Sequence, residues 1–248
     1  QKVVSVSPDY ADNTKFADEW LPAQPGTDGA LAMAMGHVIL KEFYVDKETP
    51  EFTDYVKKYT DLPFLVSLTE KNGKLTPDRF LTAADLGIET DSAEWKPVMV
   101  DSSNGEIFIP NGTIGDRHTE AGMGKWNLDL QGKDPKLTFI NEGENKQISL
   151  PRFDVDNELV DRGVSTRQIG NHLVTTVYDL VLAQYAVKRD GMPGTWPENY
   201  EDASTPNTPA WQEEITSVSS DSVIRIAREF AQNAKDSGGR SMITLGAG

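Results

Sequence analysis

The chain has 248 residues with an ordinary share of hydrophobic and charged side chains, which is typical of a globular protein with one large domain or one domain carrying an insertion. A net charge of −15 argues against nucleic acid as a partner, because phosphate binding requires clustered Lys and Arg. The absence of cysteine excludes disulfides, thiolate catalysis and iron–sulfur ligation within these residues. No stretch approaches the roughly 18 consecutive apolar residues of a membrane-spanning helix.

The first zone, residues 1–69, predicts an α/β arrangement. In chain order, the predicted elements are a strand at 3–7, a polar helix-compatible stretch at 10–18, a strand at 19–22, a helix at 30–40, a helix at 51–59 and a strand at 64–68. The helix at 30–40 is apolar almost all round, which indicates a buried helix. Thr27 or Asp28 is expected to supply its N-cap oxygen, and an acid in the first turn suits the helix dipole.

The second zone, residues 70–172, is rich in turns and predicts either an insertion on the α/β core or a small β subdomain. Two hairpins are predicted, one joining 98–100 to 107–109 through Asn104-Gly105 and one joining 137–140 to 147–150. A glycine-bearing loop at 112–124 separates them. The dispersed acids of this zone are expected to form a solvated face: Glu142, Glu144, Asp154, Asp156, Glu158 and Asp161.

The third zone, residues 173–248, returns to an α/β pattern. The predicted elements are an apolar helix with a β-like start at 173–185, a proline-rich loop at 190–209, a helix that begins at Ser219 or Ser220 and ends at Gly238-Gly239, and a strand at 241–245. Together the zones predict an α/β fold, namely a Rossmann-like open sheet with helices on both faces and a β-hairpin-rich insertion.

The best candidates for a binding function are two short loops, Ser7-Pro8-Asp9 and Pro25-Gly26-Thr27-Asp28. Each follows a predicted strand and leads toward a helix, and open α/β sheets bind ligands at that edge. Free N–H groups at the start of a helix offer a phosphate or polar-ring site. A carboxylate such as Asp28 is a natural two-oxygen acceptor for the N–H donors of guanine, and Ser7 or Asp9 can contact a ribose hydroxyl. On spacing alone, the more ordinary interpretation is that Thr27 and Asp28 only cap a helix.

Other residues are weaker candidates for a binding or catalytic function. Gly246-Ala247-Gly248 after a strand resembles half of a glycine-rich dinucleotide turn, although an ordinary loop is the commoner explanation. His37, on the apolar helix, is expected to be a core or hydrogen-bonded histidine. The three histidines lie far apart in the sequence and no nucleophile has a neighbouring base, so we predict neither a catalytic nor a metal-binding residue.

A family resemblance covers almost the whole chain. The stretch from Val4 to Leu40, with Ser7-Pro8-Asp9-Tyr10, Phe16-Ala17-Asp18-Glu19-Trp20 and Pro25-Gly26-Thr27-Asp28, resembles the molybdopterin oxidoreductase family. Within that family, the chain is most similar to respiratory nitrate reductase alpha subunits over 52–61, 110–115, 124–128, 173–180, 208–211, 224–231 and 239–243. The resemblance is weakest from 129 to 171.

This resemblance implies a bis-molybdopterin guanine dinucleotide cofactor of molybdenum whose guanosine end is held at strand-to-helix loops. Ser7, Pro8 and Asp9 match the first loop, where many relatives carry Asp at the position of Ser7. Gly26, Thr27 and Asp28 match the second loop, and the two glycines Gly246 and Gly248 match a later one. The molybdenum ligand and the ligands of a 4Fe-4S cluster would belong to an upstream region, so the chain is expected to be an internal fragment without a reaction centre, and it need not hold the cofactor alone.

For the intact subunit, the resemblance implies reduction of nitrate to nitrite with electrons from quinol. They would arrive through an iron–sulfur beta subunit and a haem-bearing membrane gamma subunit, at the cytoplasmic face of the membrane. The isolated fragment is expected to be inactive. The alternatives are another molybdopterin oxidoreductase with a different substrate, a nicotinamide-binding α/β domain, or a non-catalytic interaction module that uses residues 70–172.

Overall fold

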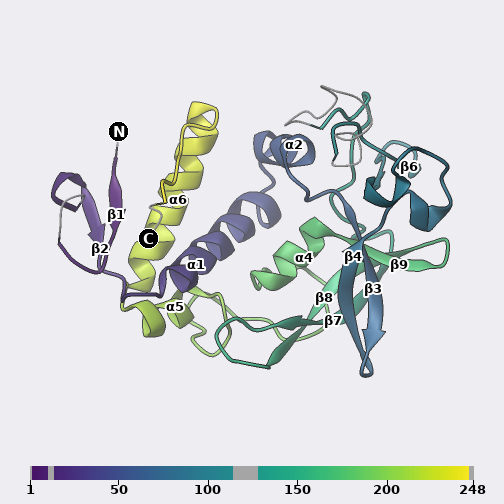
Figure 1. Ribbon diagram of the computed structural model, residues 1–248. Coiled ribbons are helices and arrows are strands. Elements are labelled where there is room, and N and C mark those ends of the chain that lie inside the picture. The colour runs from purple at the N-terminus through teal and green to yellow at the C-terminus, as the bar shows by residue number, and fades with distance from the viewer. Residues whose placement is uncertain (1, 11–13, 114–127, 246–248) are drawn as a thin grey trace. The chain divides into compact units, whose positions relative to one another are not determined.

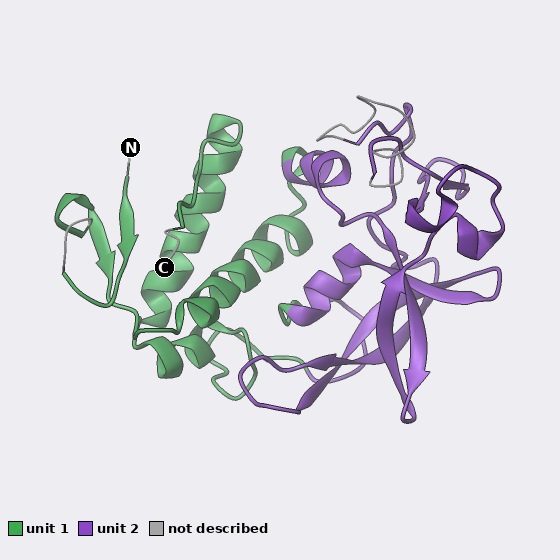
Figure 2. Ribbon diagram, in the orientation of Figure 1, with its two compact units in different colours: residues 1–51, 185–188, 196–248 green, residues 52–184, 189–195 purple. Residues whose placement is uncertain are grey.

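The chain folds into two compact units that are each assembled from distant parts of the sequence (Figures 1 and 2). The computed structural model describes residues 2–10, 14–113 and 128–245. Unit 1 comprises Gln1–Glu51, Tyr185–Lys188 and Trp196–Gly248, and unit 2 comprises Phe52–Gln184 and Arg189–Thr195. The division into zones at residues 69 and 172 stays a prediction.

Unit 1 contains a short parallel sheet and a group of helices. Its elements are β1 (Val4–Val6), the 3-10 turn η1 (Thr14–Phe16), β2 (Glu19–Leu21), α1 (Asp28–Leu40), the π-helical turn η2 (Lys41–Val45), α5 (Pro209–Thr216) and α6 (Ser220–Ser237). Strands β1 and β2 are parallel and place Ser5 opposite Trp20. Helix α1 packs against α5 and α6. A shared apolar core joins sheet and helices, with Leu21, Ala23, Leu31, Ala34, Val218, Val223 and Ile226 buried together.

Local signals explain where the C-terminal helices begin and end. Ser219 caps α6 by accepting a hydrogen bond from the N–H of Ser222, and Thr208 caps α5 in the same way. Helix α6 ends at Gly238, whose φ of 69° is left-handed, and the N–H of Gly239 donates to the carbonyl of Ala234 at 2.7 Å. The predicted start and end of α6 are therefore confirmed, whereas α5 was not predicted.

Unit 2 is built around a five-stranded antiparallel sheet in the order β4-β3-β9-β8-β7. Its elements are α2 (Pro50–Tyr59), which begins just before the unit boundary, β3 (Leu65–Lys71), β4 (Lys74–Phe80), η3 (Ala84–Leu86), η4 (Ala93–Trp95), β5 (Met99–Val100), β6 (Ile107–Phe108), β7 (Glu144–Pro151), β8 (Leu159–Ile169), β9 (His172–Thr176) and α4 (Val177–Gln184). The β3–β4 turn is formed by Asn72 and Gly73, both with positive φ, as a two-residue hairpin requires.

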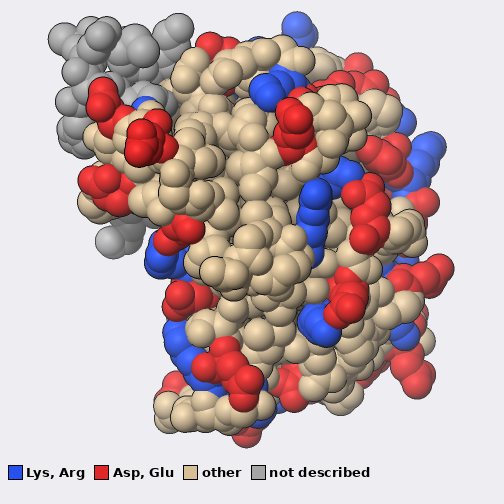
Figure 3. All heavy atoms as spheres, turned by 90° about the vertical axis from the view of Figure 1, so that its right-hand side faces the viewer, with Lys and Arg blue, Asp and Glu red and all other residues tan. Residues whose placement is uncertain are grey.

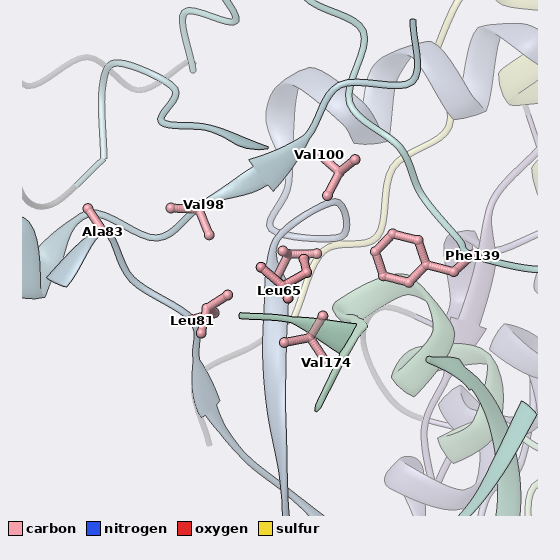
Figure 4. Packing of buried hydrophobic residues seen from close by; sticks show 8 residues of the cluster. Leu65, Leu81, Ala83, Val98, Val100, Phe139 and Val174 are labelled. Atoms are coloured by element: carbon pink, nitrogen blue, oxygen red, sulfur yellow. The ribbon is translucent and has the colours of Figure 1, made fainter. Parts of the chain in front are cut away.

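The main core of unit 2 gathers strand residues with residues of the irregular segments (Figure 4). Its members are Leu65, Leu81, Ala83, Val98, Val100, Phe139, Ile169 and Val174. In the first turn of α4, the carboxylate of Asp179 is fully buried, and its Oδ1 lies 2.6 Å from Nη1 of Arg189. On the face of the molecule in Figure 3, basic side chains are interspersed with acidic ones.

Most of the predicted elements are confirmed, including the α/β character, both short strands of unit 1, the apolar helix, the helix at 51–59 and the hairpin around Asn104-Gly105. The large sheet is antiparallel, and the Rossmann-like detail with helices on both faces stays a prediction. The predicted pairing of 137–140 with 147–150 is wrong, because β7 pairs with β8 along its whole length. Residues 137–140 instead form an irregular segment that buries Phe139 in the core and joins Thr138 to Asp179 by a hydrogen bond.

The predicted strand at 241–245 is also wrong. These residues follow α6 without regular structure, and Met242, Ile243 and Leu245 are largely exposed. Apolar β-propensity alone does not make a strand, because the backbone must pair with a neighbour, and no strand in the described parts of the chain pairs with this segment.

Candidate functional site

The parallel pair β1–β2 brings the two predicted loops to the same edge of one small sheet. Both strands run in the same direction, so both loops leave from carboxyl ends, with Val6 opposite Leu21. The N–H of Ser7 donates to the carbonyl of Leu21 at 3.2 Å, which joins the first loop to the end of the neighbouring strand. The carboxyl ends of parallel strands are where open α/β sheets bind ligands.

The first loop is exposed and internally hydrogen-bonded. Pro8 and Asp9 are exposed, and Ser7 is half-buried. The Ser7 hydroxyl donates to Oδ1 of Asp9 at 3.1 Å. The indole N–H of Trp20 donates to the backbone carbonyl of Ser7 at 2.8 Å. The loop therefore presents a hydroxyl and a carboxylate to solvent from a backbone that is anchored to β2.

The second loop leads directly into α1. Gly26 has φ of +77°, which only glycine adopts readily, and among the described residues no atom lies within 4 Å of the position that a Cβ would take. The hydroxyl of Thr27 donates to the carbonyl of Gln24 at 2.7 Å. Within the described residues, no side chain caps the helix, so the prediction that Thr27 or Asp28 supplies the N-cap oxygen is wrong.

An uncapped helix start has a chemical consequence. The first N–H groups of a helix lack the carbonyl partner that later N–H groups have, and they carry the positive end of the helix dipole. In α1 the N–H of Ala30 donates to the carbonyl of Thr27 at 3.0 Å, so the N–H groups of Asp28 and Gly29 are the donors considered for a ligand. Asp28 lies in this first turn and is exposed. Backbone donors and a carboxylate acceptor therefore stand at the same open position. That combination suits a polar ring with both acceptors and N–H donors, so the residues present fit the nucleotide end of a dinucleotide cofactor.

Contacts behind the loops hold them in place. The N–H of Gln24 donates to the carbonyl of Thr216 at 3.1 Å, and its side chain donates to the hydroxyl of Ser217 at 2.8 Å, which ties the second loop to the end of α5. Farther along α1, the buried Nδ1 of His37 lies 2.6 Å from the carbonyl of Tyr185. His37 is thus a hydrogen-bonded core histidine, as predicted.

An ion-pair cluster fastens the sheet to α6. Arg225 Nη1 donates to Oε2 of Glu19 at 3.0 Å, and Nζ of Lys2 lies 2.9 Å from the same oxygen. These cations, Arg225 foremost, hold the pKa of Glu19 down to about 2. Glu19 is therefore ionised at neutral pH, and its carboxylate connects β2 to α6 through these ion pairs.

The other predicted residues do not lie at the β1–β2 edge in the described parts of the chain. Gly246 and Gly248 fall outside the described residues. The acids from Glu142 to Glu158 named above are exposed and Asp161 is half-buried, which agrees with a mostly solvated face. Among residues 2–10, 14–113 and 128–245, no three His, Asp or Glu side chains gather in a way that could hold a metal. In the same ranges, no helix has the length and apolar character needed to cross a membrane.

Comparison with known proteins identifies the class. A family model for molybdopterin oxidoreductases matches residues 1–248. The chain belongs to the molybdopterin oxidoreductase family, which implies a molybdenum–pterin cofactor.

More particular similarity is to nitrate reductases. Over its full length, the chain is 53% identical to the nitrate reductase alpha subunit of Mycobacterium tuberculosis and 46% identical to the nitrate reductase alpha chain of Bacillus subtilis. It is 42% identical to the respiratory nitrate reductase 1 alpha chain of Escherichia coli. The chain spans 21% of the first two relatives and 22% of the third, so about a fifth of their length.

Proposed function

We propose that the chain belongs to the catalytic subunit of a membrane-associated quinol:nitrate oxidoreductase, and that it contributes binding scaffold for a bis-molybdopterin guanine dinucleotide cofactor of molybdenum. The family match over the whole chain and the similarity to three nitrate reductase alpha subunits support this assignment. The observation that carries the proposed role is the pair of open loops at the carboxyl ends of β1 and β2.

Each loop residue has a proposed part in holding the guanosine end. The carboxylate of Asp28 accepts hydrogen bonds from the N–H donors on the Watson–Crick edge of guanine, which is the natural pairing for two acceptor oxygens. The N–H groups at the start of α1 donate to acceptors of the same nucleotide. Ser7 and Asp9 contact ribose hydroxyls. Gly26, which has open space on its Cβ side among the described residues, allows close approach of the ligand to the backbone.

In this proposal the cofactor and the residues of the chain have separate roles. When bound, the cofactor supplies the redox chemistry that reduces nitrate to nitrite, and the residues of this chain bind and orient it. An iron–sulfur beta subunit and a haem-bearing membrane gamma subunit would deliver electrons from quinol to the catalytic subunit, at the cytoplasmic side of the membrane. The chain itself contributes neither a catalytic residue nor a metal ligand in this proposal, and a 4Fe-4S cluster would be held by residues elsewhere in the same subunit.

The test compares two first-turn acids in the complete protein. Asp28→Ala removes the proposed guanine acceptor from α1, whereas Asp221→Ala removes the equivalent exposed acid from the first turn of α6. Because a hydrogen bond to a charged group contributes about 1.5–3 kcal/mol, we expect Asp28→Ala to weaken cofactor binding roughly ten- to a hundredfold.

The readouts are molybdenum per polypeptide and guanosine monophosphate released by acid hydrolysis of the purified protein. Both should fall in Asp28→Ala and stay at the wild-type level in Asp221→Ala. Equal molybdenum and nucleotide content in the two variants would rule out Asp28 as a nucleotide contact. A wild-type protein that retains cofactor but reduces another oxyanion and not nitrate would refute the substrate assignment.

A further inference from the structure

Trp20 stands on the face of the β1–β2 sheet that the helices of unit 1 do not cover. Successive residues of a strand point to opposite faces. Leu21, the next residue, is buried in the core shared with α1 and α6, so Trp20 points to the other side. Ser5 is its register partner on β1 and lies on the same face.

The segment that connects β1 to β2 is fastened to this face. The indole N–H of Trp20 donates to the carbonyl of Ser7 at 2.8 Å, and the ring of Tyr10 meets that of Trp20 edge-on at 5.3 Å and 72°. Farther along, the Thr14 hydroxyl donates to the carbonyl of Asp9 at 3.4 Å and lies 3.3 Å from the hydroxyl of Ser5. Trp20 thus contacts the segment on both sides of Pro8 and Asp9.

Most of the loop residues are exposed although Trp20 contacts the loop. Pro8, Asp9 and Tyr10 are exposed, and Tyr10 keeps 62% of its surface despite the contact with Trp20. The loop itself is too short to form a core of its own. The bond from Trp20, which is half-buried on a paired strand, therefore sets the direction in which Ser7 and Asp9 project.

We propose that Trp20 is a positioning residue for nucleotide binding: its indole N–H holds the Ser7–Asp9 loop in the conformation that presents the Ser7 hydroxyl and the Asp9 carboxylate to the nucleoside. The inference rests on the proposed function and deepens it by naming the residue that preorganises the first loop. A preorganised loop loses less conformational entropy when the ligand binds, so the affinity is higher without any direct contact from Trp20.

The experiment measures binding of guanosine 5′-diphosphate (GDP) by the complete protein isolated without its cofactor. Trp20→Phe keeps an aromatic ring and removes the N–H donor. A second replacement of Trp20 by benzothienylalanine, which carries sulfur in place of the indole N–H, keeps the shape of the side chain almost unchanged. The matched control is Trp95→Phe, which removes the indole N–H of an exposed tryptophan in unit 2.

We expect both Trp20 replacements to raise the dissociation constant for GDP roughly two- to tenfold, the range for loss of one neutral hydrogen bond. The number of binding sites per protein should stay the same, because the fold is intact and only the loop is less ordered. Faster amide hydrogen exchange at Asp9 and Tyr10 should accompany the change. Trp95→Phe should bind GDP like the wild type.

The outcomes separate this inference from the function on which it rests. If both Trp20 replacements bind GDP as the wild type does while Asp28→Ala weakens binding, Trp20 does not position the loop and the proposed function stands. If the number of sites falls at unchanged affinity, the role of Trp20 is structural only and the inference is wrong. If the wild type does not prefer GDP to adenosine 5′-diphosphate, the proposed guanosine contact fails and the inference fails with it.

Discussion

Removing either member of the buried Asp179–Arg189 pair should destabilise unit 2 strongly, whereas replacing both with apolar residues should cost much less. The Asp179 side chain is 0% exposed and that of Arg189 8% exposed, with 2.6 Å between Oδ1 and Nη1. Thr138 lies between them: its hydroxyl donates to Oδ2 of Asp179 at 3.0 Å and accepts from Nη1 of Arg189 at 3.0 Å. Asp179 belongs to α4, Arg189 to the loop after it and Thr138 to the irregular segment at 137–140.

The size of the effect follows from burial. A single substitution, Asp179→Leu or Arg189→Met, leaves an uncompensated charge inside the protein, which costs about 3–5 kcal/mol. The double substitution removes both charges and fills similar volume, so its cost should be small or even favourable. The two single effects should therefore be far from additive, with a coupling free energy of about 3 kcal/mol or more.

Amide hydrogen exchange of β8 and β9 is the suitable assay, because it reports the opening free energy of unit 2 independently of unit 1. The double variant should keep protection close to the wild type, and each single variant should lose it. A double variant that is destabilised by the sum of the single effects would refute the reasoning, since it would show that the charges do not stabilise each other.

The same pair gives unit 2 a pH dependence. Burial raises the pKa of Asp179 to about 6, and Arg189 and Thr138 only partly oppose it. This folded-state pKa lies above the ordinary value of about 3.9, so the folded state binds the Asp179 proton more tightly than the unfolded chain does. Protonation of Asp179 therefore stabilises unit 2, and this stabilisation is lost as the pH rises from about 4 to about 6. In Asp179→Asn this part of the pH profile should be absent, and an unchanged profile would contradict the assignment.

Two further predictions concern α1 and the isolated chain. A Cβ at Gly36 would lie 2.3 Å from Cε1 of Tyr185, so the clash in Gly36→Ala should destabilise unit 1 by about 1–3 kcal/mol, offset by up to about 1 kcal/mol from the higher helix propensity of Ala. Gly29→Ala, which has open space among the described residues, should not destabilise the unit. Equal melting temperatures for the two variants would show that the Tyr185 ring moves aside freely. The 248-residue polypeptide, purified alone and supplied with a reduced dye, should not reduce nitrate, and turnover by it would overturn the proposed role as scaffold.

Helices and tight turns were predictable because their signals are local. The start of α6 at Ser219, its end at Gly238 and the hairpin connection that contains Asn104-Gly105 each depend on a few neighbouring residues. Helix α5, which begins at Pro209 after the N-cap Thr208, has the same kind of signal, but the prolines and polar residues at 190–209 predict a loop there.

Strand pairing was not predictable in the same way. The segment 137–140 has the β-propensity of a hairpin arm, and so does 241–245, yet neither is a strand. The partner of β7 is β8, a long strand near whose start lies Asp161, one of the acids predicted to form a solvated face. Whether a β-branched run becomes a strand depends on which backbone lies beside it, and that is a property of the whole fold.

For the candidate site, the sequence by itself determined the residue types and their order: a Ser-Pro-Asp loop after one strand, and a Pro-Gly-Thr-Asp loop before an apolar helix. Only the tertiary structure decided that the two strands are parallel neighbours, which places both loops at one edge. It also decided that the hydroxyl of Thr27 turns back to Gln24 and leaves the helix start uncapped, and that Trp20 fastens the first loop. These features arise from contacts between residues that are not adjacent in the chain, and only folding creates such contacts.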